Sequence, residues 1–105
     1  IPHLGALNGS YQSLDRAGIW RRANVYADSA LASPSEIRHF LEHYGPDKLL
    51  FGSDYPFGTP GQELGKIERM RLAPADFAKV VCGNILGLLE GAVQAGRCSG
   101  SKPVC

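Results

Sequence analysis

The stretch that decides the fold is LLFGSDYPF, residues 49–57. Its first half is a short continuous apolar run, which is typical of a strand covered on both faces. The run ends at Asp54, and two prolines and two glycines between residues 54 and 61 interrupt both helix and sheet. We therefore expect a buried strand that carries the carboxylate of Asp54 into a loop.

The clearest helix lies upstream of this strand. Ser33, Pro34 and Glu36 place Ser at the N-cap, Pro at the first helical position and Glu at the third, which satisfies backbone donors at a helix start. One buried stripe follows at the i, i+3, i+4, i+7 spacing: Ile37, Phe40, Leu41 and Tyr44. Gly45-Pro46 then ends the helix.

Strands and helices alternate along the rest of the chain. Residues 1–4 form a short apolar segment that predicts the end of a strand. Residues 9–23 have weak helical periodicity, and residues 24–29 predict a second strand. A short helix through Ile67 and Met70 is expected after the 54–61 loop. A longer helix opens at 73–76, with Asn84 among the apolar residues of its inner face: Phe77, Val80, Val81, Ile85, Leu88 and Leu89. The alternation implies parallel strands joined by right-handed crossovers, so the sequence predicts an α/β protein or part of one.

Composition removes some classes of function. The 105 residues are 44% apolar and 20% charged, with 11 Lys+Arg against 10 Asp+Glu, so no basic field is present to hold nucleic acid. The longest apolar stretches are far short of the roughly 20 residues of a membrane-spanning helix, and no signal peptide is visible after Ile1. Three cysteines are too few for a disulfide scaffold and suit a reducing compartment. We expect a soluble, cytoplasmic protein with no membrane or nucleic-acid partner, in which Cys82 is a small packing residue and Cys98 and Cys105 are thiols.

Three polar positions follow the three expected strands. His3 ends the first, Asp28 and Ser29 end the second, and Asp54 ends the third. In parallel α/β architectures reactive side chains lie at the carboxyl ends of strands, where an imidazole and a carboxylate can bind a divalent metal or act as base and acid beside one. The spacing is equally compatible with a plain interpretation, in which Asp54 is a loop or cap carboxylate and His3 an ordinary terminal histidine.

His39 and His43 are a weaker candidate. They are four residues apart on the helix that begins after Ser33, a spacing that lets two imidazoles share a metal. The glutamate of a His-Glu-x-x-His site is misplaced, however. Because both histidines project away from the apolar stripe, we expect a solvated polar face.

Residues 49–57 resemble the signature at the last barrel strand of the amidohydrolase-related metal-dependent hydrolases, the group that includes aminocarboxymuconate semialdehyde decarboxylase. Residues 1–5 resemble that family's sixth-strand histidine motif, 24–30 its seventh strand, and 83–89 its terminal helix. The resemblance implies the C-terminal portion, about strands 6–8 with their helices, of a TIM (β/α)8 barrel. We expect residues 1–91 to be this barrel segment and 92–105 to be a flexible tail.

The resemblance also implies roles. Asp54 would be the strand-eight aspartate, which contacts the metal and handles a proton, and His3 the strand-six histidine, either a metal ligand or a polarising group. Gly52 and Pro56 would shape the loop, and Asn84 would hydrogen-bond the backbone of that loop. The metal expected is zinc. The family's first-strand His-x-His and fifth-strand histidine have no counterpart, so two ligands remain where catalytic zinc takes three.

The function implied is a metal-dependent hydrolase of an ester, lactone or amide in a full-length context, inactive as this chain alone. The alternative on the same fold is non-oxidative decarboxylation of an aromatic or unsaturated acid, so the substrate is a small carboxylic acid, ester, lactone or amide. An alternative from a different class is a non-catalytic truncated or assembly module. A homo-oligomer in which several copies complete one another's sheets also stays open.

Overall fold

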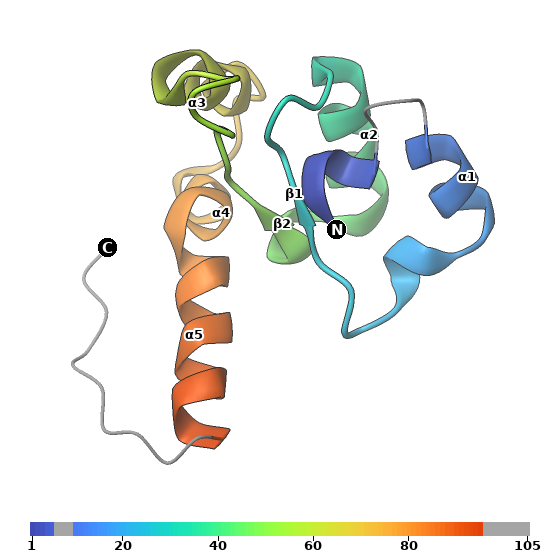
Figure 1. Ribbon diagram of the computed structural model, residues 1–105, viewed down its shortest axis with the longest axis vertical. Coiled ribbons are helices and arrows are strands. Elements are labelled where there is room, and N and C mark those ends of the chain that lie inside the picture. The colour runs from blue at the N-terminus through green and yellow to red at the C-terminus, as the bar shows by residue number, and fades with distance from the viewer. Residues whose placement is uncertain (6–9, 96–105) are drawn as a thin grey trace.

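The computed structural model describes residues 1–5 and 10–95 (Figure 1). Helical elements dominate these residues, and two short strands lie between them. In chain order the elements are η1 (Pro2–Gly5), α1 (Ser10–Arg16), η2 (Ile19–Arg21), β1 (Ala27–Asp28), α2 (Pro34–Tyr44), η3 (Pro46–Lys48), β2 (Leu49–Leu50), α3 (Pro60–Glu68), α4 (Pro74–Ala78), η4 (Lys79–Gly83) and α5 (Asn84–Ala95).

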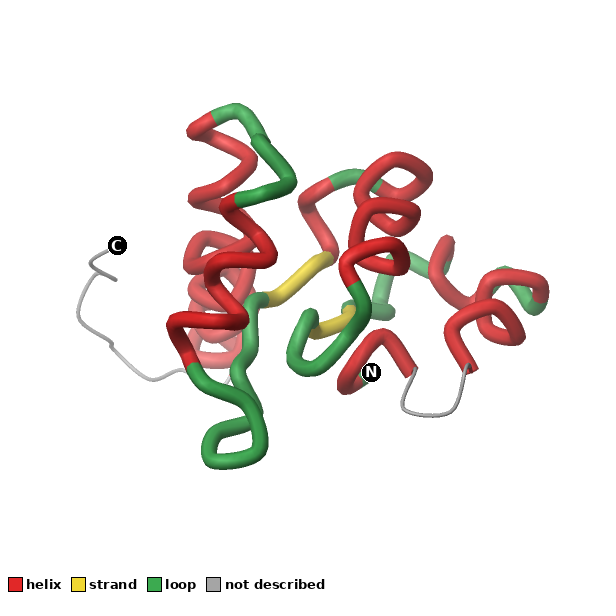
Figure 2. The backbone as a smooth tube through the Cα atoms, turned by 90° about the horizontal axis from the view of Figure 1, so that it is seen from above, coloured by secondary structure: helices red, strands yellow, loops and turns green. Residues whose placement is uncertain are grey.

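The sheet is parallel, as the sequence predicts. β1 pairs with β2 in a register that sets Ala27 opposite Leu49. Ile1 extends the sheet by one residue on the other side of β1, because its amino group donates to Tyr26 O at 2.6 Å and Asp28 N–H donates to its carbonyl at 3.1 Å. These two bonds are the pattern of a parallel pair. Figure 2 shows the strands at the centre, with α1 and α2 on one side and α4 and α5 on the other.

The expected strand over residues 1–4 is wrong beyond Ile1. Pro2–Gly5 form a 3-10 turn in which His3 and Leu4 have left-handed φ angles of 56° and 52°. The reason is a long-range hydrogen bond, because the Asp28 carboxylate accepts His3 N–H and draws the chain out of the extended conformation. The turn also buries Leu4 completely in the core. The other two strands form where predicted, but each is shortened to two residues.

Local chemistry explains the helix starts. The Ser33 hydroxyl accepts Glu36 N–H at 3.2 Å and donates to the Glu36 carboxylate at 2.7 Å, so the predicted capping pattern is confirmed. Thr59 caps α3 in the same way by accepting Gln62 N–H. The expected helix over 9–23 is instead α1 followed by the short η2, because Gly18 adopts a left-handed φ of 74° between them; Gly9 lies outside the described residues.

The core forms between the helices and the strands. Its largest fully buried side chains include Trp20, Phe40, Ile37, Leu49 and Ile67, and Trp20 meets Phe40 edge to face with ring centroids 5.4 Å apart. The predicted stripe of α2 is confirmed, since Ile37 and Phe40 are fully buried and its other two members pack against them.

The long helix predicted from residue 73 is divided into α4, the π-helical η4 and α5. Val80 of η4 is buried, but Ile85, Leu88 and Leu89 of the expected inner face are 40%, 36% and 54% exposed. Their burial was therefore predicted wrongly for this chain. The described residues provide no layer on that side of α5, which projects from the rest of the molecule (Figure 1).

Asn84 and Cys82 also differ from expectation. Asn84 Nδ2 donates to Pro46 O at 2.6 Å and Leu49 O at 2.9 Å, so it holds the segment that enters β2 and not the loop that leaves it. Cys82 is disulfide-bonded, whereas Cys98 and Cys105 lie outside the described residues. α5 continues to Ala95, and the tail beyond it is likewise not described. No helix among the described residues is long and apolar enough to cross a membrane.

Candidate functional site

His3 and Asp54 meet at one end of the sheet. His3 Nε2 lies 3.7 Å from Asp54 Oδ2, and their side chains are 19% and 38% exposed. His3 lies just after Ile1, which pairs with one edge of β1, and Asp54 lies after β2, which pairs with the other edge. The two residues therefore approach each other from the two neighbours of β1. The structure thus brings together the two site residues that the sequence proposes.

The imidazole of His3 is held in one tautomer. Its Nδ1 lies 2.6 Å from Ala30 O. Because a carbonyl oxygen only accepts, Nδ1 carries a proton and donates it, so the neutral form of this ring has its lone pair on Nε2. Nε2 is the atom that faces Asp54. A histidine fixed through Nδ1 by a backbone carbonyl is the usual form of an imidazole that binds a metal.

The Asp54 carboxylate is presented by a tight turn. Asp54 has a left-handed φ of 53°, and its carbonyl accepts Phe57 N–H at 2.8 Å and Gly58 N–H at 3.1 Å. A Cβ at Gly58 would lie 2.1 Å from Ser53 O, so only glycine fits where the turn closes. Non-glycine residues with positive φ concentrate at functional sites and persist where the surroundings determine them.

Asp28, which the sequence places at the end of the second strand, binds backbone N–H groups of the neighbouring loops. Its Oδ1 accepts His3 N–H at 2.9 Å and Ala30 N–H at 3.0 Å, which leaves it linked to the two loops that approach the site. Ser29 is 1% exposed, and its hydroxyl has no hydrogen-bond partner within the described part of the chain. Asp28 therefore acts on the backbone, and the polar pair at the end of the sheet is His3 with Asp54.

Sequence reasoning missed a buried ion pair that supports the loop after β1. Glu63 of α3 is 5% exposed, and its carboxylate accepts Leu31 N–H and contacts the Lys66 ammonium. Lys66 in turn donates to Ala32 O at 2.7 Å. The i, i+3 spacing of Glu63 and Lys66 could have predicted the ion pair. No local pattern could have predicted its contacts with Leu31 and Ala32, which are 32 and 34 residues away along the chain.

The chain matches the family model described as "Amidohydrolase" over residues 3–90. It belongs to the amidohydrolase family. The amidohydrolase domain is a TIM barrel, and the parallel strands with their helices are consistent with part of one. A metal-dependent, hydrolase-like function is the function of this superfamily, whose members generally bind divalent metals and act on small molecules. No solved structure matches the chain significantly.

For an amidohydrolase, His3 and Asp54 are suitable metal donors. An imidazole nitrogen with a free lone pair and a carboxylate oxygen are both zinc ligands, and both lie at the same end of the sheet. Residues 1–5 and 10–95 contain no group of three His, Cys, Asp or Glu side chains that could hold a metal. The described part of this amidohydrolase chain thus offers two donors to such a site.

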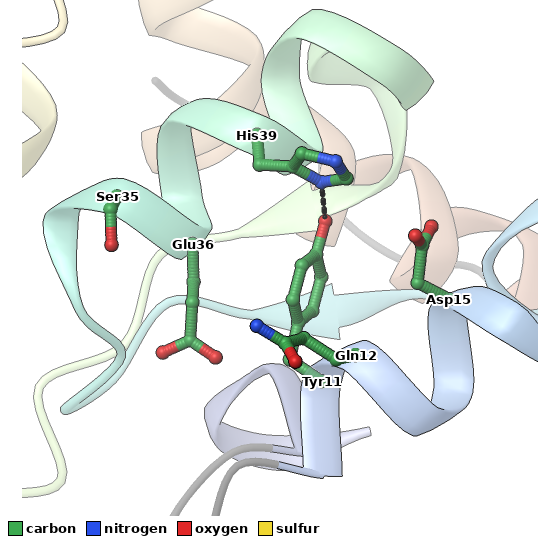
Figure 3. Close-up of a pocket in the computed structure, with 6 residues that line it drawn as sticks. All are labelled: Tyr11, Gln12, Asp15, Ser35, Glu36 and His39. Atoms are coloured by element: carbon green, nitrogen blue, oxygen red, sulfur yellow. Dashed lines mark hydrogen bonds between the residues drawn. The ribbon is translucent and has the colours of Figure 1, made fainter.

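A second polar cluster lies between α1 and α2 (Figure 3). A cavity of about 190 Å³ is lined by Tyr11, Gln12, Asp15, Ser35, Glu36 and His39. The Tyr11 hydroxyl is hydrogen-bonded to His39 Nδ1, and burial, followed by the nearby Asp15 carboxylate, raises the pKa of Tyr11 well above its ordinary value. The prediction of a solvated face is therefore wrong for His39, whose ring packs edge-on against Tyr11. His43 is exposed, and its ring stacks on that of His39 with the centroids 3.9 Å apart.

Proposed function

We propose that this chain contributes His3 and Asp54 as two ligands of a divalent metal, zinc, in a barrel enzyme that hydrolyses an ester, lactone or amide. The observation that carries the proposal is the 3.7 Å approach of His3 Nε2 to Asp54 Oδ2 with the His3 proton placed on Nδ1. Family membership over residues 3–90 supports it independently.

A divalent metal bound at these residues would act as a Lewis acid and lower the pKa of a bound water. The carboxylate of Asp54 has two oxygens, so it can bind through one and accept a proton through the other. Its 38% exposure leaves it accessible to a small substrate. With Nδ1 committed to Ala30, the neutral His3 offers an acceptor at Nε2, which favours the ligand role over polarisation of a substrate oxygen.

The finer assignment is to the group that includes aminocarboxymuconate semialdehyde decarboxylase. The Gly-Ser-Asp-Tyr-Pro run at 52–56 supports this assignment. In that group the same residues would serve non-oxidative decarboxylation, with Asp54 delivering a proton to carbon. Because the two ligands in the described part of the chain fall short of the three that catalytic zinc takes, we propose that residues 1–91 act only within a complete barrel and that the 105-residue chain alone has no turnover.

Zinc titration of the 105-residue chain tests the ligand assignment. With the histidine side chains labelled by 15N, we expect a saturable shift of His3 Nε2 on addition of Zn2+, and His3→Ala and Asp54→Asn should each weaken binding by more than the roughly 10–100-fold seen for outer-sphere partners. His43→Ala removes an exposed histidine of α2 and is the matched control, with no expected effect. Binding that survives both site variants, or that requires His43, would refute the assignment.

Activity is tested separately. A barrel that contains residues 1–91 as its last segment should show zinc-dependent turnover that is lost on Asp54→Asn. Release of acid from esters, lactones or amides would identify a hydrolase, and release of carbon dioxide from unsaturated acids would identify the decarboxylase. If the complete barrel binds no metal and turns over neither group of substrates, the non-catalytic module is favoured.

A further inference from the structure

Asp28 lies at the end of β1, between the two strand positions that carry the candidate ligands. Its Oδ1 accepts two backbone N–H groups, from His3 at 2.9 Å and from Ala30 at 3.0 Å. Ala30 is the residue whose carbonyl accepts the His3 Nδ1 proton at 2.6 Å. One carboxylate oxygen therefore holds both ends of the hydrogen bond that fixes the His3 ring.

We infer that Asp28 is a positioning residue for His3, which it acts on through the backbone of His3 and Ala30 and without touching a metal or substrate itself. Its importance for catalysis rests on the proposed function. The clamp, by which we mean the Asp28 carboxylate with these two N–H groups, fixes where the His3 backbone leaves the sheet and where the Ala30 carbonyl points. The result is an imidazole that donates from Nδ1 to Ala30 O and turns Nε2 toward Asp54.

The conformation of the two loops shows why a clamp is needed. His3 has a left-handed φ of 56°, and Leu31, directly after Ala30, has one of 58°. Non-glycine residues seldom take this conformation unless other contacts impose it. A single carboxylate oxygen that accepts both backbone N–H groups ties these two segments to one point.

Gly52, two residues after β2, lies beside the same carboxylate. A Cβ at Gly52 would lie 3.3 Å from Ala30 Cβ and 3.8 Å from the carboxyl carbon of Asp28. A Cβ at position 52 would therefore be tight against Ala30 and in ordinary van der Waals contact with the Asp28 carboxylate. The segment that leads from β2 to Asp54 thus leaves little free space beside Ala30.

The experiment compares Asp28→Asn with Asp28→Ala in the 105-residue chain. Asparagine keeps an acceptor oxygen at the same place, whereas alanine removes it. Side-chain 15N spectra at a pH where His3 is neutral report which ring nitrogen carries the proton, and amide hydrogen exchange reports on the N–H groups of His3 and Ala30. Asp47→Ala, which removes an exposed carboxylate, is the matched control.

We expect Asp28→Ala to lose the preference for the proton on Nδ1 of His3 and to lose exchange protection at both amides. Asp28→Asn should retain both, and Asp47→Ala should change neither. If Asp28→Ala fails to fold, Asp28→Asn carries the test. Loss of the Nδ1 preference in Asp28→Asn would show that the charge of Asp28 is needed and that its acceptor oxygen is not sufficient, which would overturn the clamp.

The clamp would be refuted by an Asp28→Ala protein that keeps the same tautomer and the same protected amides. A core variant of α2, Phe40→Leu, separates this effect from general destabilisation, because it should lower stability and leave the His3 tautomer unchanged. The proposed function fails by a different result, which is zinc binding that does not depend on His3 and Asp54. The two failures are therefore distinguishable.

Discussion

Replacing Gly58 by alanine tests how the loop after β2 holds Asp54. The added Cβ would lie 2.1 Å from Ser53 O and 3.0 Å from Leu31 Cδ2. The first of these atoms belongs to the backbone and cannot rotate away. Because Gly58 N–H donates to Asp54 O, any movement that relieves the clash also opens the turn that presents the carboxylate.

The magnitude follows from the overlap. Ser53 O or the turn must move by roughly an ångström, and overpacking of this kind costs about 1–3 kcal/mol. With a urea m-value of about 1 kcal/mol/M for a small chain, the unfolding midpoint should fall by about 1–3 M. The same movement should separate Asp54 from His3 and weaken zinc binding in the titration described above.

Gly61→Ala is the matched control. Gly61 is in the first turn of α3, and a Cβ there would meet nothing within 4 Å. Because alanine reduces the freedom of the unfolded chain and favours helix, this variant should be more stable by about 0.5 kcal/mol. The two glycine-to-alanine changes are thus expected to have opposite signs.

Urea unfolding followed by far-ultraviolet circular dichroism measures both variants. The reasoning would be refuted by a Gly58→Ala protein as stable as the wild type, or by two variants that shift the midpoint in the same direction. A stable Gly58→Ala protein with unchanged zinc binding would further show that the turn does not control Asp54.

Other perturbations test the supports of the fold. Asn84→Ala should lower the free energy of unfolding by about 1–3 kcal/mol, because two carbonyls lose a donor; Asn24→Ala, at an exposed position, should have no effect in the same urea assay. Ser33→Ala should cost about 1 kcal/mol through the lost cap of α2, and an unchanged urea midpoint would contradict this. Burial and the hydrogen bond to Asp15 raise the pKa of Tyr44 above 10.0, so the folded chain binds more protons than the unfolded chain above that pH and stability falls as pH rises further. Tyr44→Phe should make this fall shallower in urea titrations at increasing pH, and an equal slope would refute the assignment.

Elements defined by short stretches of sequence could be predicted well. Three such elements are the cap at Ser33, the stripe through Ile37 and Phe40, and the turn after residue 53. Each depends only on residues that are close together in the sequence. The meeting of His3 with Asp54 was also predictable, because parallel strands end at the same edge of a sheet. The longer helix was only partly predictable, since burial of Ile85 and Leu89 depends on a neighbouring layer.

The sequence by itself therefore determined the cap of α2, the parallel pairing of the two strands and the edge at which His3 and Asp54 lie. Tertiary structure alone decided the tautomer of His3 and the left-handed turn that carries it. The physical reason is distance along the chain: the bonds from His3 to Asp28 and Ala30 span 25 and 27 residues, and such contacts exist only once strand register has placed the two loops together.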